Sequence, residues 1–550
     1  MNEMRGQLTV RGIIIGCIGC VIITAASAYT ALKMGALPWP IIFAALISLF
    51  FLRVLGSRSL NEANVTHTIM SAGAMVAGGL AFTIPGIWML GLGDVPFWQM
   101  LLIALAGVVL GLIGCGYFRR QLIEEQELEF PIGEAAGETL KVCNTGGKVG
   151  VKLFSAMGFA GIWTALRDCL GAIPTLLFSE VTIPGVTFGL YLSPMMMAVG
   201  FLVGVGAMFA WFGGALGQIL IVTGGSAAGL WTVELGQSIN SSLGMGLMMG
   251  CGIAVVFKDV IFKAIKSASN KSKKAATAND GKKISHRVGL LALGGAALSY
   301  VVCIFLGIGP IGSAIVIVLS FVTVVMSAQS VGQTGIDPME IFGLIVLLFV
   351  AIIGDTPQLQ LFFVAAIIAV ACGLGGDVMN DFKAGHMLGT SPTAQLVGQG
   401  IGGVLGAFIA AGAMFALVSA YGPDAFGAGQ QFVAAQASVV AALVGGIPHV
   451  PAFVIGLVAG FLIYCLGGPA MMIGLGVYLP FYMSFTAFLG CVAKLIYDKV
   501  CASRREKLAA EEQAAAKEDS DQNGLIVASG FLGGESIVGV LIALVAICTL

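Results

Sequence analysis

Charged residues are rare in this sequence. Only 10% of its 550 residues are Asp, Glu, Lys or Arg, whereas 58% are hydrophobic. Soluble domains carry about 25% charged residues, so this chain has too few charged residues to cover the water-facing surface of a soluble protein of its size. The few basic residues form clusters between apolar stretches. We interpret these clusters as topological signals and expect no nucleic-acid partner.

The sequence also lacks the short motifs of several enzyme classes. It has no HExxH zinc motif and no GxxxxGK[ST] nucleotide-binding loop. The four His residues are dispersed and the 12 Cys form no framework, so neither a metal site nor a cofactor is predicted. A GxGD pattern at 91–94 is typical of intramembrane aspartyl proteases, which remain an alternative. Because no second Asp lies in a nearby apolar span, we predict that the chain is not an enzyme.

Apolar stretches are abundant, and many approach the length of about 20 residues that crosses a bilayer core. We predict an all-α polytopic membrane protein with about 16 transmembrane helices, some of them broken or re-entrant. A basic linker at 266–287 would divide two similar transmembrane halves, 1–265 and 288–550. The second half would contain a polar cytoplasmic loop at 500–523, in which 504–523 would be a mobile helix or a linker. The distribution of Lys and Arg places the N-terminus in the cytoplasm and the chain in the cell membrane.

Carboxylates inside apolar segments are costly, at roughly 2.5–3.5 kcal/mol each, and are therefore candidate functional groups. Glu134 and Glu138 lie four positions apart, on one face of a predicted helix, and Glu535 stands alone in the last apolar segment. We predict that these three residues carry protons. The alternatives are an interfacial helix with solvated acids for the first two, and a structurally paired carboxylate for Glu535.

Polar residues interrupt the apolar pattern in three further segments, 326–343, 373–399 and 474–486, where Gly or Pro would break the helix. Uncoiled backbone at membrane depth is typical of transporter binding sites. Ordinary loops and interfacial anchors are the alternatives. The predicted substrate-binding residues in these segments are Gln329, Gln333, Asp337, Asp381, Lys383, Tyr478 and Tyr482.

Arg167 and Asp168 also fall inside a predicted span. Adjacent residues do not face each other on a helix, so each would need a partner on a neighbouring helix. We expect a structural pair between helices at this position.

Six segments resemble the oligopeptide transporter (OPT) superfamily, which includes the yellow stripe-like metal-chelate transporters. They are SAGAMVAGGLAFTIPGI at 71–87, FPIGEAAGETLK at 130–141, GQTGIDPMEIFGL at 332–344, GDVMNDFKAGHMLGTSPTAQ at 376–395, GVYLPFYMS at 476–484 and ASGFLGGESIVGVL at 528–541. Each segment is weakly specific, but six in the expected order are highly specific.

The resemblance implies a symporter that couples proton entry to the import of small peptides or chelated metals. It also implies about 16 spans with an internal duplication and, given the compact length, a bacterial inner-membrane protein. Family members often carry basic residues where this chain has Thr393 and Ala394. That departure leaves the choice between peptide and chelate open. A channel or facilitator is the alternative function, and a homo-oligomer is left open.

Overall fold

The computed structural model describes residues 6–35, 37, 40–142, 148–178, 180–255, 257–258, 286–334, 337–353, 356–427, 429–506 and 510–549. Within these ranges the chain is almost entirely helical, which confirms the all-α class. Seven helices are long and apolar enough to cross a membrane, and five shorter apolar helices accompany them. Nearly all of the predicted linker at 266–287 lies outside the described residues.

The first half of the chain contains the helices up to residue 255. They are α1 (Val10–Met34), α2 (Pro40–Val54), α3 (Leu60–Ala81), α4 (Pro85–Met89), α5 (Phe97–Arg119), α6 (Pro131–Val142), α7 (Lys148–Asp168), α8 (Pro194–Leu202), α9 (Val205–Ile219), α10 (Gly225–Ala227) and α11 (Val233–Val255), with π-helical turns η2 (Arg120–Glu125) and η4 (Leu220–Gly224).

The second half begins with α13 after the linker. Its helices are α13 (His286–Phe305), α14 (Pro310–Thr334), α15 (Met339–Ile353), α16 (Gln358–Cys372), α17 (Met379–Leu388), α18 (Pro392–Tyr421), α19 (Ala435–Gly445), α20 (Val450–Cys465), α21 (Ala470–Tyr478), α22 (Phe481–Arg505) and α23 (Ala510–Thr549), with the π-helical turn η6 (Gly373–Asp377) and the 3-10 turn η7 (Pro423–Ala425).

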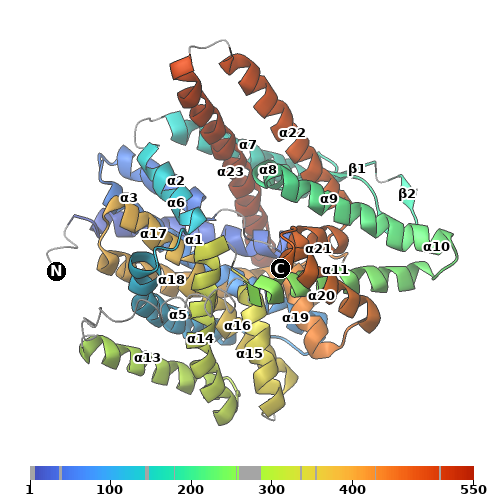
Figure 1. Cartoon of the computed structure of the whole chain (residues 1–550), viewed down its shortest axis with the longest axis horizontal. Coiled ribbons are helices and arrows are strands. Elements are labelled where there is room, and N and C mark those ends of the chain that lie inside the picture. The colour runs from blue at the N-terminus through green and yellow to red at the C-terminus, as the bar shows by residue number, and fades with distance from the viewer. Residues whose placement is uncertain are drawn as a thin grey trace.

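Two small antiparallel strand pairs, one enclosing the other in sequence, fill the connection between α7 and α8. Strand β1 (Leu176–Leu177) pairs with β4 (Leu190–Tyr191), and β2 (Thr182–Ile183) pairs with β3 (Val186–Thr187). In Figure 1 they lie beside α8 and α9.

Helix breaks occur in all three segments where the sequence predicts them. α14 ends at Thr334 before α15, α16 passes through η6 into the short α17, and α21 ends just before Pro480. A further break separates α8 from α9 at 203–204. Proline and glycine explain these breaks, because neither supports continuous helix.

The predicted polar loop at 500–523 is mostly helix. Residues 500–505 complete α22, and 510–523 form the first turns of α23, so α23 runs unbroken from polar sequence into the bundle. The many Ala, Glu, Lys and Gln residues of this segment are strong helix formers, which accounts for the difference. The two helices form a long hairpin at the top of Figure 1.

Glycine allows the central helices to touch. A Cβ on Gly406 of α18 would collide with the backbone of Gly73 of α3, and one on Gly402 would collide with the backbone of Ile69. The same close packing joins α5 to α16, where Gly107 and Gly111 face the backbone around Ile367 and Ala371. Because lipid tails provide no hydrophobic drive between helices, such van der Waals contacts are a principal source of cohesion.

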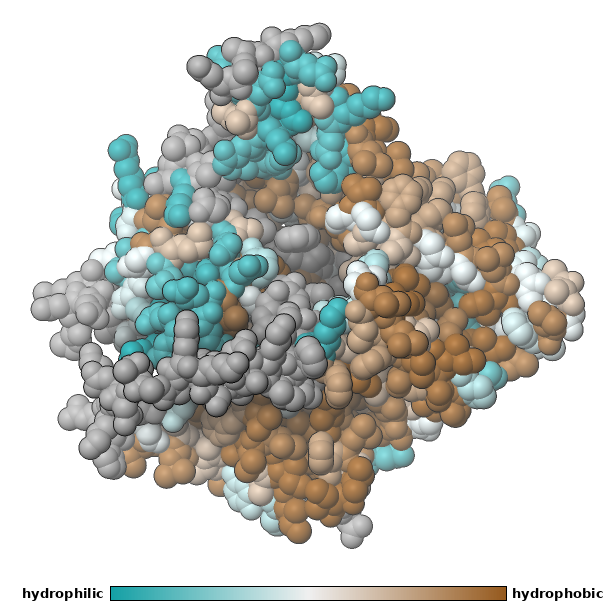
Figure 2. Space-filling model, viewed as in Figure 1, coloured by the Kyte–Doolittle hydropathy of each residue, from teal (hydrophilic) through white to brown (hydrophobic). Residues whose placement is uncertain are grey.

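Hydrophilic residues gather at the top and left of Figure 2, where Figure 1 places the polar ends of α22, α23, α6 and α17, whereas hydrophobic residues cover the right and bottom. We call this region the basic end. It contains Arg11 paired with Glu62, Arg119 paired with Glu124, and Lys152 bonded to Asn523. By the positive-inside rule, the basic end is the expected cytoplasmic side.

Candidate substrate chamber

A polar cavity of about 610 Å³ lies where α1, α7, α18 and α22 meet the β1–β4 hairpin. Its charged lining residues are Lys33, Arg167 and Asp168. Four tyrosines, Tyr29, Tyr191, Tyr421 and Tyr482, surround them. A cavity of this size, with few charges and several aromatic hydroxyls, has the dimensions of a small-molecule site. We call it the chamber.

Lys33 supplies the chamber with a buried positive charge. It lies in the last turn of α1, which Gly35 ends in the left-handed conformation at φ 65°, and its side chain is only 8% exposed. A cation is favoured at a helix C-terminus by the backbone dipoles. Its Nζ lies 5.9 Å from the ring centre of Tyr29 and 5.3 Å from that of Phe432. Within the described part of the chain, no carboxylate forms an ion pair with it.

Arg167 is held by three acceptors on three elements. Its Nε and Nη2 each donate to the carboxylate of Asp168 at 2.7 Å, and Nη1 donates to the carbonyl of Leu192 at 2.8 Å. Nη2 also donates to Glu535 at 2.9 Å. The expectation that Arg167 and Asp168 do not face each other is wrong. Asp168 is the last residue of α7, where the helix no longer constrains the direction of its side chain.

Glu535 lies on α23 behind Arg167 and is completely buried. Besides Arg167, its carboxylate accepts bonds from the hydroxyl of Ser193 at 2.9 and 2.8 Å and from the backbone N–H of Met195 at 2.9 Å. Ser193 caps the N-terminus of α8, so the carboxylate also faces the positive end of that helix. The structure therefore matches the paired alternative for Glu535.

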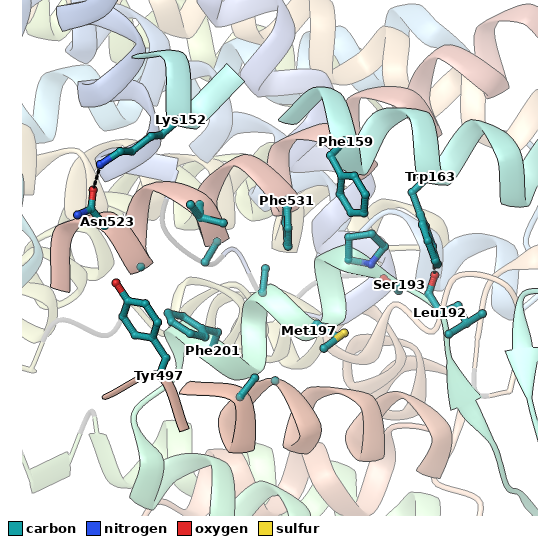
Figure 3. A pocket seen from close by; sticks show the side chains of 17 residues that line it. Lys152, Phe159, Trp163, Leu192, Ser193, Met197, Phe201, Tyr497, Asn523 and Phe531 are labelled. Atoms are coloured by element: carbon teal, nitrogen blue, oxygen red, sulfur yellow. Dashed lines mark hydrogen bonds between the residues drawn. The ribbon is translucent and has the colours of Figure 1, made fainter. Parts of the chain in front are cut away.

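An apolar groove, also of about 610 Å³, lies on the other side of Ser193 and runs between α7, α8, α22 and α23 toward the basic end. Figure 3 shows Phe159, Trp163 and Phe531 along it and Lys152 and Tyr497 near its polar end. Trp163 donates to the carbonyl of Leu192 at 3.1 Å, the carbonyl that Arg167 also uses. The wall between groove and chamber is thus cross-linked by hydrogen bonds.

Of the residues predicted to bind substrate, Tyr482 alone lines the chamber. Tyr478 is buried and bonds to Ser438 instead. Gln329 is half-buried on α14, and the side chain of Gln333 lies outside the described residues.

Asp337, Asp381 and Lys383 belong to a second polar region near the basic end. Asp337 accepts from Ser327 at 2.6 Å, and Asp381 accepts from Ser71. Lys383 donates to the carbonyl of Leu128 at 2.8 Å. The structure thus separates the predicted binding residues into two regions.

The predicted proton carriers are likewise dispersed. Glu134 is exposed on α6 and lies 3.4 Å from Nζ of Lys383. The backbone of Glu138 is in α6, but its side chain is outside the described residues. Glu134 therefore fits the alternative of an interfacial helix with solvated acids.

Two functional candidates escaped the sequence interpretation. Lys33 stands at the end of the first span, directly before Gly35 and Pro38, and this lysine beside a break is the signal that could have identified it. His67 was set aside because the four histidines are far apart in sequence. Its neighbour in space, Asp381, lies on a helix of the other half.

Apolar helices closed around a charged, tyrosine-lined chamber define the class, a multi-pass membrane protein with an internal polar site. Comparison with known proteins gives the family. The model of the OPT oligopeptide transporter protein family matches residues 7–546, and the chain belongs to this family. The chain is also similar to a Haemophilus influenzae protein named "Putative oligopeptide transporter". The two are 25% identical over 604 aligned positions, which cover 94% of this chain and 92% of the relative.

Proposed function

We propose that the protein is a secondary active transporter that binds small peptides in the chamber and moves them across the membrane with protons. Family membership and the name of the Haemophilus relative support peptide transport. The observation that carries the proposal is the ammonium of Lys33, which is buried in the chamber wall and has no ion-pair partner among the described residues. A buried charge without a partner is costly, and a substrate carboxylate would complete it.

The other chamber groups suit the remaining parts of a peptide. Asp168 is 27% exposed and lines the cavity, so it can meet the terminal ammonium of a peptide even while Arg167 holds it. Tyrosine hydroxyls both donate and accept, as peptide amides require. Tyr191 and Tyr482 come from different halves of the chain, and their rings pack edge to face at 5.7 Å. A substrate between them would contact both halves, as alternating access requires.

A peptide-like metal chelate is the second candidate substrate, because it also presents carboxylates to Lys33 and Arg167. Within the described residues, no group of three His, Cys, Asp or Glu side chains could hold a metal ion. A transported metal would then be held by its chelator and not by the protein. The proposed role is transport and not catalysis.

Uptake into proteoliposomes tests this function. Labelled trialanine, its C-terminal amide and a metal chelate would be compared with and without an inward proton gradient. Gradient-dependent accumulation supports symport, whereas uptake that only equilibrates and ignores the gradient identifies a channel or facilitator. Lys33→Gln should raise the KM for trialanine about 10- to 150-fold, since a hydrogen bond to a charged group contributes about 1.5–3 kcal/mol.

The amide provides the internal control, because it carries no carboxylate for Lys33 to bind. Its KM should change little in Lys33→Gln. Lys499 is exposed on α22 at the basic end, and Lys499→Gln should behave as the unaltered protein. An equal rise in the KM of trialanine and of its amide would show that Lys33 does not bind the substrate carboxylate.

A further inference from the structure

A histidine and an aspartate form a completely buried pair between the two halves of the chain. His67 on α3 and Asp381 on α17 are both 0% exposed, and Nε2 of His67 lies 3.2 Å from Oδ1 of Asp381. Neither ring nitrogen of His67 makes a hydrogen bond, and Oδ1 of Asp381 makes none. Buried polar atoms are nearly always satisfied in native proteins, so this pair needs an explanation.

The surroundings of the pair are polar, and within the described residues no Lys or Arg forms an ion pair with Asp381. Ser71 donates to the other oxygen of Asp381, and Gln395 of α18 donates to its backbone carbonyl at 2.7 Å. Asp377 of η6 lies within electrostatic range of Asp381. The site thus contains one titratable ring and two carboxylates with few hydrogen bonds.

Other charged groups on the adjoining elements either point elsewhere or are already paired. The carboxylates of Glu340 on α15 and of Asp337, which precedes that helix, interact electrostatically with Asp377. Arg119 of α5 lies near the ring of Phe382 and pairs with Glu124 of η2. The remaining elements packed on α17 contribute Glu134, which pairs with Lys383, and the exposed Lys141 on α6; Glu62, which pairs with Arg11, on α3; and Arg120, which pairs with Glu125, on η2.

We propose that the His67–Asp381 pair holds the transported proton, an assignment that rests on the proton-coupled transport proposed above. One proton from water adds to the ring nitrogen of His67 that faces away from Asp381. The pair changes from a neutral imidazole beside a carboxylate to an imidazolium–carboxylate ion pair, and no other bond is made or broken. The proton returns to water on the opposite side.

The coupling follows from burial. A carboxylate shut away from water without a counter-charge is strongly unfavourable, whereas a closely paired one is not. The contact between α3 and α17 therefore closes readily only when the pair is protonated. Because α3 belongs to the first half and α17 to the second, one proton controls whether the halves close at this point. Glu134 and Glu535, the carriers predicted from sequence, are respectively solvent-exposed and already paired with a cation.

The test separates coupling from movement of the substrate. His67→Gln and Asp381→Asn would be reconstituted and assayed for trialanine accumulation under a proton gradient and for counterflow exchange at equal pH. Both variants should lose accumulation under the gradient. Exchange should continue in Asp381→Asn, which has no buried carboxylate to pair, and should be impaired in His67→Gln, which leaves that carboxylate without a counter-charge. His386→Gln is the matched control, since it makes the same change at an exposed position of α17, and it should accumulate normally. If His67→Gln fails to fold, Asp381→Asn still provides the test, because Asn has nearly the same shape as Asp.

A second readout needs no peptide. Infrared difference spectra of the purified protein between pH 5 and 8 should show an imidazole signal that His67→Gln removes and a carboxylate signal that Asp381→Asn alters. Absence of both changes would overturn the proposal even if peptide is not the substrate. Normal accumulation in either variant would overturn it as well, as would loss of exchange in folded Asp381→Asn. If the unaltered protein exchanges no peptide, the function fails, and the spectra still decide the proton site.

Discussion

Replacing either partner of the Arg167–Glu535 ion pair should destabilise the protein, but by unequal amounts. Removing Arg167 leaves a completely buried carboxylate with only Ser193 and the N–H of Met195 as donors. Removing the charge of Glu535 leaves Arg167 with its two bonds to Asp168 and one to Leu192. The arginine keeps a counter-charge when its partner is neutralised, whereas the glutamate does not.

The magnitudes follow from this difference. Arg167→Met strands a buried charge, and such losses cost about 3–5 kcal/mol in unfolding free energy. Glu535→Gln loses part of one charged hydrogen-bond network, at about 1–3 kcal/mol. The double variant removes both charges and should cost less than the sum of the two single changes.

Unfolding of the purified protein in mixed micelles, titrated with a denaturing detergent, would measure these free energies. Folding of each variant would be checked by circular dichroism and by its elution as a single species. Should Arg167→Met prove milder than Glu535→Gln, or should the two effects simply add, Asp168 would not compensate Arg167 as described. The ion pair would then contribute little to the stability of the folded protein.

Two further changes test the packing by the same assay. Gly406→Ala places a Cβ against the backbone of Gly73 and should destabilise the α3–α18 contact by about 1–3 kcal/mol, and wild-type stability would contradict the close approach. The N–H of Gly133 donates to Oδ1 of Asn380 at 3.0 Å, and Asn380→Ala removes this acceptor. It should cost about 1–3 kcal/mol, and a neutral effect would indicate that water replaces the amide.

Helix lengths and helix breaks could be predicted from sequence because their causes are local. A bilayer fixes the length of an apolar span, and Pro392 and Pro480 stand where helices begin in the structure. The polar start of α23 is also a local matter, because its Ala and Glu residues favour helix. Local signals thus predict the elements well.

The sites could not be predicted with the same success, because they depend on which helices become neighbours. The sequence identified Glu535 and Asp381 as unusual buried acids but gave no indication that Arg167 and His67 would face them. Both contacts join residues of different halves. A single sequence without related sequences does not reveal such pairing.

The two contacts between the halves differ in one chemical property that assigns them different roles. Arginine does not lose its proton in proteins, so Arg167 remains a counter-charge for Glu535. It can serve as a permanent connection beside the chamber. In the proposal above, the His67–Asp381 pair near the basic end forms its ion pair when a proton binds and loses it when the proton leaves. A lasting contact beside the substrate and a proton-dependent one at a distance would let the halves rock about the first while the second opens and closes.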